Sequence, residues 1–280
     1  RQISLKCRVF FTRRNPPVPV QLAERVKRVK PSPTVALTGR VARLKAEGHD
    51  IIGLGVGEPD FDTPTHIADA GVDAIRDGFT RYTAVEGIPE LKDAIIAKFK
   101  RDNAISYTRP QILVSTGAKQ TIYNLFMAVI DPGDEVVIPA PYWVSYPDMA
   151  LLAEGTPVTP YAGPEQGYKI TPAQLEAAIT PKTRLFMLNS PSNPTGAAYS
   201  SAELHAIGAV LRRHPDVLIA TDDMYEHIYW AKEPFASFLT ACPDLFDRTI
   251  TINGVSKSYA MTGWRIGYCG GPVEIVTAMS

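Results

Sequence analysis

The sequence predicts an α/β protein whose mostly parallel sheet is covered by helices on both faces. From about residue 50 onward, short and continuous apolar runs of strand length alternate with helical patterns. Uninterrupted apolar strands are typical of parallel sheets buried on both faces. Apolar residues make up 45% and charged residues 21% of the 280 residues, so the chain has the composition of a globular protein with a core.

The expected helices begin at residues that favour helix N-termini. The first runs from Thr63-Pro64 to Gly78, and the second opens at Pro89, because proline is well tolerated in the first turn. A third covers residues 118–130. The stretches TPAQ, from Thr171, and SSAE, from Ser200, have the form of capping boxes and each predicts a helix start.

The expected strands are the apolar runs between these helices. They cover residues 51–54, 112–115, 136–138, 185–188, 217–220 and 249–252. In open α/β sheets, ligands bind beyond the carboxyl ends of the strands. The residues that directly follow each run are therefore the candidates for chemistry.

Charge and cysteine content exclude several classes of protein. Lysine plus arginine total 29 and aspartate plus glutamate total 29, so the basic excess that binds nucleic acid or an acidic membrane is lacking. Cys7, Cys242 and Cys269 are far apart and form no CxxC pair, which excludes a disulfide scaffold and a zinc ribbon. No apolar run approaches the ~20 residues of a membrane-spanning helix. We expect a cytoplasmic enzyme without a metal site.

Both ends of the chain are unusual. Residues 1–20 hold five basic residues and no acidic one. Such a composition fits an arginine-rich targeting segment, an expression remnant or misread upstream sequence, so this atypical extension is left out of the fold prediction. Residues 272–280 have the pattern of a beginning helix, and we expect the chain to be a fragment of a longer protein.

Two glycine-containing turns resemble nucleotide-binding motifs without matching them. The stretch GLGVGEP (53–59) lacks the third glycine of the dinucleotide fingerprint, because Glu58 stands in its place. Residues Gly117 and Ala118 follow a strand and open a helix, where free amides suit a phosphate, although small residues also begin ordinary helices. The spacing there excludes a Walker loop.

The remaining strand ends carry a set of side chains that fits one cofactor. A lysine among small residues (Lys257) can form a Schiff base with a carbonyl, and a carboxylate at the end of a buried strand (Asp222) can keep a pyridine nitrogen protonated. Tyrosine and asparagine can bind a ring hydroxyl, and arginine with helix amides can bind a phosphate. Pyridoxal 5'-phosphate needs this set. Each residue alone has a structural explanation, such as a solvated lysine or a capping aspartate.

Longer stretches resemble the class I pyridoxal-phosphate aminotransferases of fold type I, in the aspartate aminotransferase branch found in bacteria and plastids. The lysine signature GVSKSYAMTGWRIG (254–267) matches throughout. The other matching stretches are KPSPTVA (30–36), GEPDFDTP (57–64), GAKQ (117–120), DPGDEVVIPAPYWVSYP (131–147), NSPSNPTG (189–196) and DDMYEH (222–227). The resemblance runs from about residue 21 to the end.

The resemblance implies roles for residues at these positions. Lys257 is similar to the Schiff-base lysine and proton shuttle, Asp222 to the carboxylate at the pyridine nitrogen, and Tyr225 and Asn193 to the partners of the ring oxygen. If the strand geometry continues, Asp223 points to the opposite face from Asp222.

The resemblance also implies a phosphate cup and a substrate site. Gly117, Ala118 and Arg265 are similar to the phosphate-binding residues, Trp143 to the aromatic that stacks on the ring, and Gly57 to the backbone contact with the substrate carboxylate. Trp143 and Asn193 are expected to contact substrate as well.

Two further positions concern a partner subunit and specificity. Tyr82 is similar to a tyrosine that reaches the phosphate of the neighbouring subunit, which implies a homodimer with shared sites. Lys119, beside the phosphate cup, is expected to help select an acidic side chain; the alternative is a solvated helix lysine.

The implied activity is amino transfer from an L-amino acid, aspartate or glutamate, to a 2-oxo acid. The alternatives are another fold type I lyase or decarboxylase, and a non-catalytic fragment that only binds the cofactor. The implied organisation is an N-terminal arm with a small-domain segment (21–49) and a cofactor-binding large domain (50–280). The C-terminal small domain of the family, with its carboxylate-binding arginine, is expected to be largely absent, and with it most of the turnover.

Overall fold

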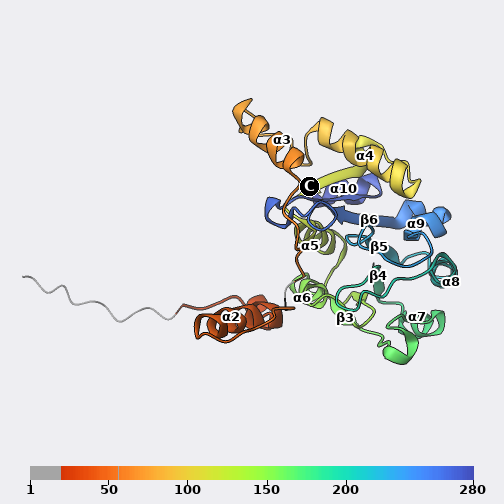
Figure 1. Cartoon of the computed structure of the whole chain (residues 1–280). Coiled ribbons are helices and arrows are strands. Elements are labelled where there is room, and N and C mark those ends of the chain that lie inside the picture. The colour runs from red at the N-terminus through yellow and green to blue at the C-terminus, as the bar shows by residue number, and fades with distance from the viewer. Residues whose placement is uncertain (1–19, 56) are drawn as a thin grey trace, which may run out of the picture.

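The computed structural model describes residues 20–55 and 57–280, and its main body is a seven-stranded sheet between layers of helices (Figure 1). The strand order is β1-β7-β6-β5-β4-β2-β3. The strands are β1 (Ile112–Ser115), β2 (Glu135–Val137), β3 (Thr156–Val158), β4 (Thr183–Asn189), β5 (Leu218–Asp222), β6 (Thr249–Gly254) and β7 (Gly267–Gly270). The expectations for residues 1–19, Cys7 included, lie outside the described residues.

The sheet is mostly parallel, as predicted. Strands β3, β2, β4, β5 and β6 pair in parallel, and only β7 runs antiparallel to its neighbours β1 and β6. The carboxyl ends of β4, β5 and β6 therefore meet at one edge. Asn189 pairs with Asp222, and Asp222 pairs with Ile252, so the ends of these three strands are in register.

The helices form where the sequence supplies their start signals. They are α1 (Glu24–Lys27), α2 (Pro33–Ala46), α3 (Thr65–Arg76), α4 (Pro89–Asn103), α5 (Ala118–Val129), α6 (Ser145–Leu152), α7 (Pro172–Ala178), α8 (Ser201–Arg212), α9 (Phe238–Ala241) and α10 (Val273–Met279). The predicted capping boxes are confirmed: Thr171 with Gln174 opens α7, and Ser200 with Glu203 opens α8. No helix in the described part of the chain is long and apolar enough to cross a membrane.

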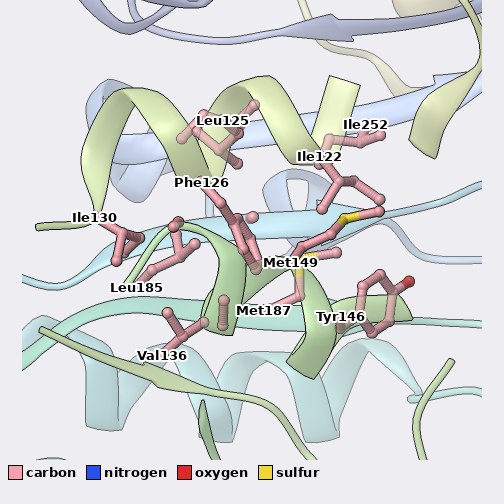
Figure 2. Close-up of a cluster of buried hydrophobic side chains, with 14 of the residues drawn as sticks. Ile122, Leu125, Phe126, Ile130, Val136, Tyr146, Met149, Leu185, Met187 and Ile252 are labelled. Carbon is pink, nitrogen blue, oxygen red and sulfur yellow. The ribbon is translucent and has the colours of Figure 1, made fainter. Parts of the chain in front are cut away.

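One face of the sheet is covered by α5, α6 and α10. Figure 2 shows the core between them, where Phe126 of α5 and Met149 of α6 meet Leu185 and Met187 of β4. Burial of such large side chains contributes about 1.5–3 kcal/mol each. Tyr146 of α6 lies at one end of this cluster, with its hydroxyl pointing away from it.

The other face is covered by α4, α7, α8 and α9. Alternate residues of β4, such as Phe186, pack there against Leu204 and Leu211 of α8, because successive side chains of a strand point to opposite faces. Phe99 of α4 forms a third cluster with Tyr107 and other residues near β1. Helices thus cover both faces, as the sequence predicts.

The prediction of a strand at residues 51–54 is wrong. The segment has no regular structure, and Ile52 and Leu54 are 86% and 90% exposed. An extended apolar run becomes a strand only where another strand offers hydrogen bonds, and this segment follows α2, which lies beside the sheet and not on it (Figure 1). Strands β3 and β7 were not predicted.

Candidate active site

Asp222 ends β5 and points to the face that α6 covers. The Tyr146 hydroxyl donates a hydrogen bond to Asp222 Oδ2 at 2.6 Å, and the Met224 amide donates to Oδ1 at 3.1 Å. Both Asp222 and Tyr146 are buried. Burial raises the pKa of the Asp222 carboxyl above its usual value, while the two hydrogen bonds act in the opposite direction.

Asp223 lies on the opposite face of the strand end, as the alternation of strand side chains predicts. Its Oδ2 is buried without a hydrogen-bond partner in the described structure. Burial, then the nearby charge of Glu226, raises the pKa of Asp223 well above its usual value, and Lys98 lowers it. The two neighbouring aspartates therefore have separate surroundings, and only Asp222 faces α6.

Lys257 follows β6 and is half-buried at the same edge of the sheet. Its Nζ donates a hydrogen bond to the carbonyl of Gly57, which brings residues 200 positions apart together. Nζ also lies 6.0 Å from the centre of the Tyr225 ring. Burial lowers the pKa of the Lys257 ammonium; the Glu58 charge opposes this and the Arg265 charge adds to it. A lowered pKa makes the neutral amine, which is the nucleophilic form, easier to reach.

Tyr225 and Asn193 meet beside this lysine. Asn193 Nδ2 donates to the Tyr225 hydroxyl at 3.3 Å. The backbone amide of Asn193 donates to Asn189 Oδ1 at 2.8 Å, which fixes the loop to the end of β4. Gly57, Asn193 and Tyr225 line a cavity of about 520 Å³. This volume lies in the range of small-molecule sites.

Arg265 and the start of α5 form a cradle for an anion. Gly117 precedes α5 with a φ of +82°, and a Cβ atom there would collide with the guanidinium of Arg265. Arg265 Nη1 donates to the Thr262 carbonyl at 2.8 Å. The first amides of a helix have no carbonyl within the helix to bind, so the backbone amides of Ala118 and Lys119 are available as donors next to a fixed cation.

Trp143 and Lys119 form a pair at the side of this cradle. Lys119 Nζ lies 5.0 Å from the centre of the Trp143 ring, a cation–π distance. The Trp143 ring stands edge-on to Tyr146 at 5.3 Å. Burial raises the pKa of Asp148 above its usual value, and the charge of Lys119 opposes this shift.

The segment around residues 57–64 packs against the loop that carries Arg265. Thr262 donates to Glu58, and Trp264 Nε1 donates to Thr63 Oγ1 at 3.1 Å. Thr63 Oγ1 donates in turn to the Ala260 carbonyl at 2.6 Å. Tyr82, in contrast, is fully exposed, and this single chain does not bring it to the other candidate residues.

A buried polar cluster on the opposite face was missed by the sequence analysis. Glu226 contacts the Lys98 ammonium and accepts hydrogen bonds of 2.8 Å from the side-chain amides of Asn103 and Asn253. Glu226 also forms a group of metal-type ligands with Asp102 and His227. Lys98 already supplies a cation to this group, so we interpret it as a structural link between α4 and the turn after β5. The signal that could have found it is a lysine, Lys98, at a buried position of α4.

Comparisons with known proteins agree with this architecture. The family model "Aminotransferase class I and II" matches residues 49–280. An aspartate/prephenate aminotransferase of Nitrosomonas europaea is 64% identical over 93% of this chain and 66% of its own length, and one of Cereibacter sphaeroides is 60% identical over 92% and 64%. The chain therefore spans just under two thirds of the length of these relatives.

Solved structures give the same result for the fold. The aspartate aminotransferase of Rhizobium meliloti has a TM-score of 0.90 and 51% identity, covering 93% of this chain and 65% of that one. The Thermus thermophilus enzyme with maleate has a TM-score of 0.88 and 43% identity, covering 93% and 67%. The expected fold type I is thus confirmed, and the chain belongs to the class I and II aminotransferase family.

Proposed function

We propose that the protein is a pyridoxal-phosphate-dependent aminotransferase that moves an amino group from L-aspartate or L-glutamate to a 2-oxo acid. The observation that carries this proposal is the convergence of a buried carboxylate, Asp222, and a lysine of lowered pKa, Lys257, at one edge of the sheet. They come from different strands and adjoin the same aromatic residue, Tyr225.

The anion cradle fits the phosphate group of this cofactor. The bare backbone of Gly117 lets the Arg265 guanidinium approach the first turn of α5, and helix N-termini favour anions. Gly117, Ala118 and Arg265 would hold the phosphate. Gly267, whose absent side chain would collide with the Ala118 amide, keeps this end of α5 close to β7.

The remaining residues fit the ring. Asp222 would bind the pyridine nitrogen, Tyr225 and Asn193 would bind the ring oxygen, and Trp143 would cover one side of the ring. When bound, pyridoxal phosphate supplies a reactive carbonyl and an electron-withdrawing ring.

Lys257 would move the proton. Its Nζ is held by the carbonyl of Gly57, and a lysine with lowered pKa gives up its proton more readily and can take it back. Gly57 and Asn193 line the cavity beside it and would contact the substrate carboxylate. Residues after three separate strands would thus bind the substrate, orient it and move its proton.

The substrate proposal draws on the relatives. Two of them are named aspartate/prephenate aminotransferases, which supports aspartate as donor and adds prephenate as a candidate 2-oxo acid acceptor. Lys119 would favour substrates with a second carboxylate. We further propose that residues 50–280 form the cofactor-binding domain, with residues 21–49 as an arm, in a cytoplasmic homodimer.

Borohydride reduction tests the cofactor assignment. After loading with pyridoxal 5'-phosphate and reduction, mass spectrometry should find the label on Lys257 alone, and Lys257→Ala should lose both label and turnover. Lys119→Ala is the matched control and should keep the label. A label on another lysine contradicts the proposal. The labelling does not require turnover, so a slow enzyme still gives a result.

An assay of products tests the reaction. L-aspartate with 2-oxoglutarate or prephenate should give exchange of the amino group. Release of carbon dioxide from the amino acid instead would identify a decarboxylase.

A further inference from the structure

Asp222 occupies a place where a charged carboxylate is costly. It is 5% exposed and lies at the end of a central strand beneath α6. Burial is the largest influence on it and favours the neutral acid. A neutral acid cannot stabilise a cationic ring nitrogen, so a residue in this role needs help to stay ionised.

Tyr146 is placed to give that help. It is 2% exposed, and its hydroxyl lies 2.6 Å from Asp222 Oδ2. Its ring packs at one end of the apolar cluster of Figure 2, and the Trp143 ring stands edge-on to it. The side chain is therefore fixed with only its hydroxyl directed at the carboxylate.

The two hydrogen bonds suit the anion better than the acid. The Met224 amide can only donate, and it faces Oδ1. Burial, then the Asp222 charge, raises the pKa of Tyr146 well above its usual value, so its hydroxyl keeps its hydrogen. A proton on either oxygen of Asp222 would weaken the hydrogen bond which that oxygen accepts, because a protonated carboxyl oxygen is a poorer acceptor than a carboxylate oxygen.

We propose that Tyr146 is a positioning residue that keeps Asp222 ionised by donating its hydroxyl hydrogen to Oδ2. The proposal rests on the proposed function in one respect only, which is that the ionised Asp222 would stabilise a cationic ring nitrogen of the cofactor. The state of Asp222 itself can be measured without cofactor. Hydrogen bonds to charged groups are the strong ones, so one phenol can change the ionisation of one buried acid measurably.

The groups that face Asp222 are known from each neighbouring element. Tyr146 comes from α6, and Tyr225 lies in the turn after β5, where the Asp222 charge raises its pKa after burial. Asp223 is the next residue and is itself acidic. From β4, Asn189 Nδ2 donates to the backbone carbonyl of Asp222, at 2.8 Å, and not to its carboxylate, and β6 contributes the apolar Ile252. Tyr146 is thus the side chain that donates to the carboxylate.

The first experiment measures the titration of Asp222 by carbon-13 NMR of the cofactor-free chain with labelled aspartates. The signal is assigned by its loss in Asp222→Asn. In Tyr146→Phe the midpoint should rise by about 1–2 pH units, the size expected for one hydrogen bond to a charged group. A midpoint that does not move overturns the proposal.

The second experiment compares stability against pH, with Tyr107→Phe as the matched control. Tyr107 is also buried, and its hydroxyl donates at 3.2 Å to the neutral Thr251. An aspartate whose folded pKa exceeds its unfolded pKa of about 3.9 loses stability as pH rises between these two values. A higher folded pKa in Tyr146→Phe extends that loss. The urea midpoint of Tyr146→Phe should therefore fall further below that of wild type as the pH rises from 4.5 to 7.5.

The control and a double variant complete the test. Tyr107→Phe should show a deficit that is constant over the same pH range. In the background of Asp222→Asn, which has no charge to keep, the pH-dependent part of the Tyr146→Phe deficit should vanish. Equal pH profiles for the two tyrosine variants, or an unchanged profile in the double variant, would contradict the proposal, even if Tyr146→Phe folds poorly at high pH.

A titration with pyridoxal 5'-phosphate separates this proposal from the proposed function. Tyr146→Phe should bind the cofactor several-fold more weakly than Tyr107→Phe if Asp222 receives the ring nitrogen. If wild type does not bind the cofactor, the proposed function fails, while the Asp222 midpoints still decide the role of Tyr146.

Discussion

The pair Asp222 and Asp223 shows how much one residue of strand register decides. Both are buried and adjacent, yet only Asp222 faces α6 and Tyr146. The alternation of strand side chains predicts this difference from the sequence. The ring-nitrogen role depends on it, because the two side chains lie on opposite faces of the sheet.

Asparagine substitutions at these two positions test the register. In the loaded enzyme, Asp222→Asn should lower kcat by several orders of magnitude, since the anion that favours a protonated ring nitrogen is removed. Asp223→Asn should be milder, because its unpartnered Oδ2 lies on the other face. Steady-state kinetics checks both. A severe loss in Asp223→Asn with a mild one in Asp222→Asn would place the register one residue away.

Lys119 is the residue-scale test of substrate choice. Its ammonium is held over the Trp143 ring, at 5.0 Å from the centre, where a second substrate carboxylate could meet it. Lys119→Ala should raise KM for aspartate more than KM for a neutral amino acid, whereas a solvated lysine would affect neither. Equal changes in the two KM values would refute the specificity role.

At the scale of elements, the sequence predicted five of the seven strands and missed β3 and β7. The runs at 112–115, 185–188, 217–220 and 249–252 all fall on strands, because apolar side chains fill most of their positions and helices cover both faces of the sheet. Strand β7 contains Gly267 and Gly270, which are poor strand formers. A Cβ at Gly267 would collide with the first turn of α5, so close packing removed the signal that predicts a strand.

In the candidate site, too, the sequence predicts residues at strand and helix ends better than residues within helices. The residues named from the sequence follow strands or open helices, where chain topology brings them together without knowledge of packing. Tyr146 lies within α6, and Lys98 within α4; their partners Asp222 and Glu226 depend on how these helices cross the sheet. Periodicity alone does not give that crossing, because each helix has several residues on its buried side.

Arg248 gives a test of one helix end. Its guanidinium donates to the carbonyls of Leu211, His214 and Val217, at 2.6–2.9 Å, where α8 ends. The carbonyls of Leu211 and His214 also accept from the backbone amides of His214 and Val217, so the guanidinium adds a charged donor to each of them. Arg248→Met should reduce the free energy of unfolding by about 2–3 kcal/mol, because three hydrogen bonds from a charged donor are lost.

Arg213→Met is the matched control for that helix end. Arg213 is exposed, and it donates to the Ala209 carbonyl at 3.0 Å and pairs with Glu176 on the surface. Exposed ion pairs contribute little, so the loss should stay below about 1 kcal/mol. Urea unfolding of both variants measures the difference. Equal losses would show that the three buried contacts add nothing.

At the scale of the whole molecule, several large apolar side chains remain uncovered. Phe61, Phe79, Tyr82 and Val85 are each more than 70% exposed, and they belong to segments around α3. Exposed apolar patches of this kind mark interaction surfaces. In the homodimer that we propose, a second copy of the chain would cover them and would bring its own Tyr82 towards the cradle of Arg265.

Mixed dimers test the sharing of sites. Tyr82→Ala should bind pyridoxal 5'-phosphate more weakly, because a tyrosine hydroxyl at the phosphate is lost, and Lys257→Ala should lose the borohydride label. In a co-expressed mixed dimer, one site receives Tyr82 from one chain and Lys257 from the other, so half of the sites should recover both tight binding and the label. Sedimentation should show a dimer at micromolar concentration. Weak binding at every labelled site of the mixed dimer would mean that Tyr82 acts within its own chain, and a monomer would remove the proposed interface altogether.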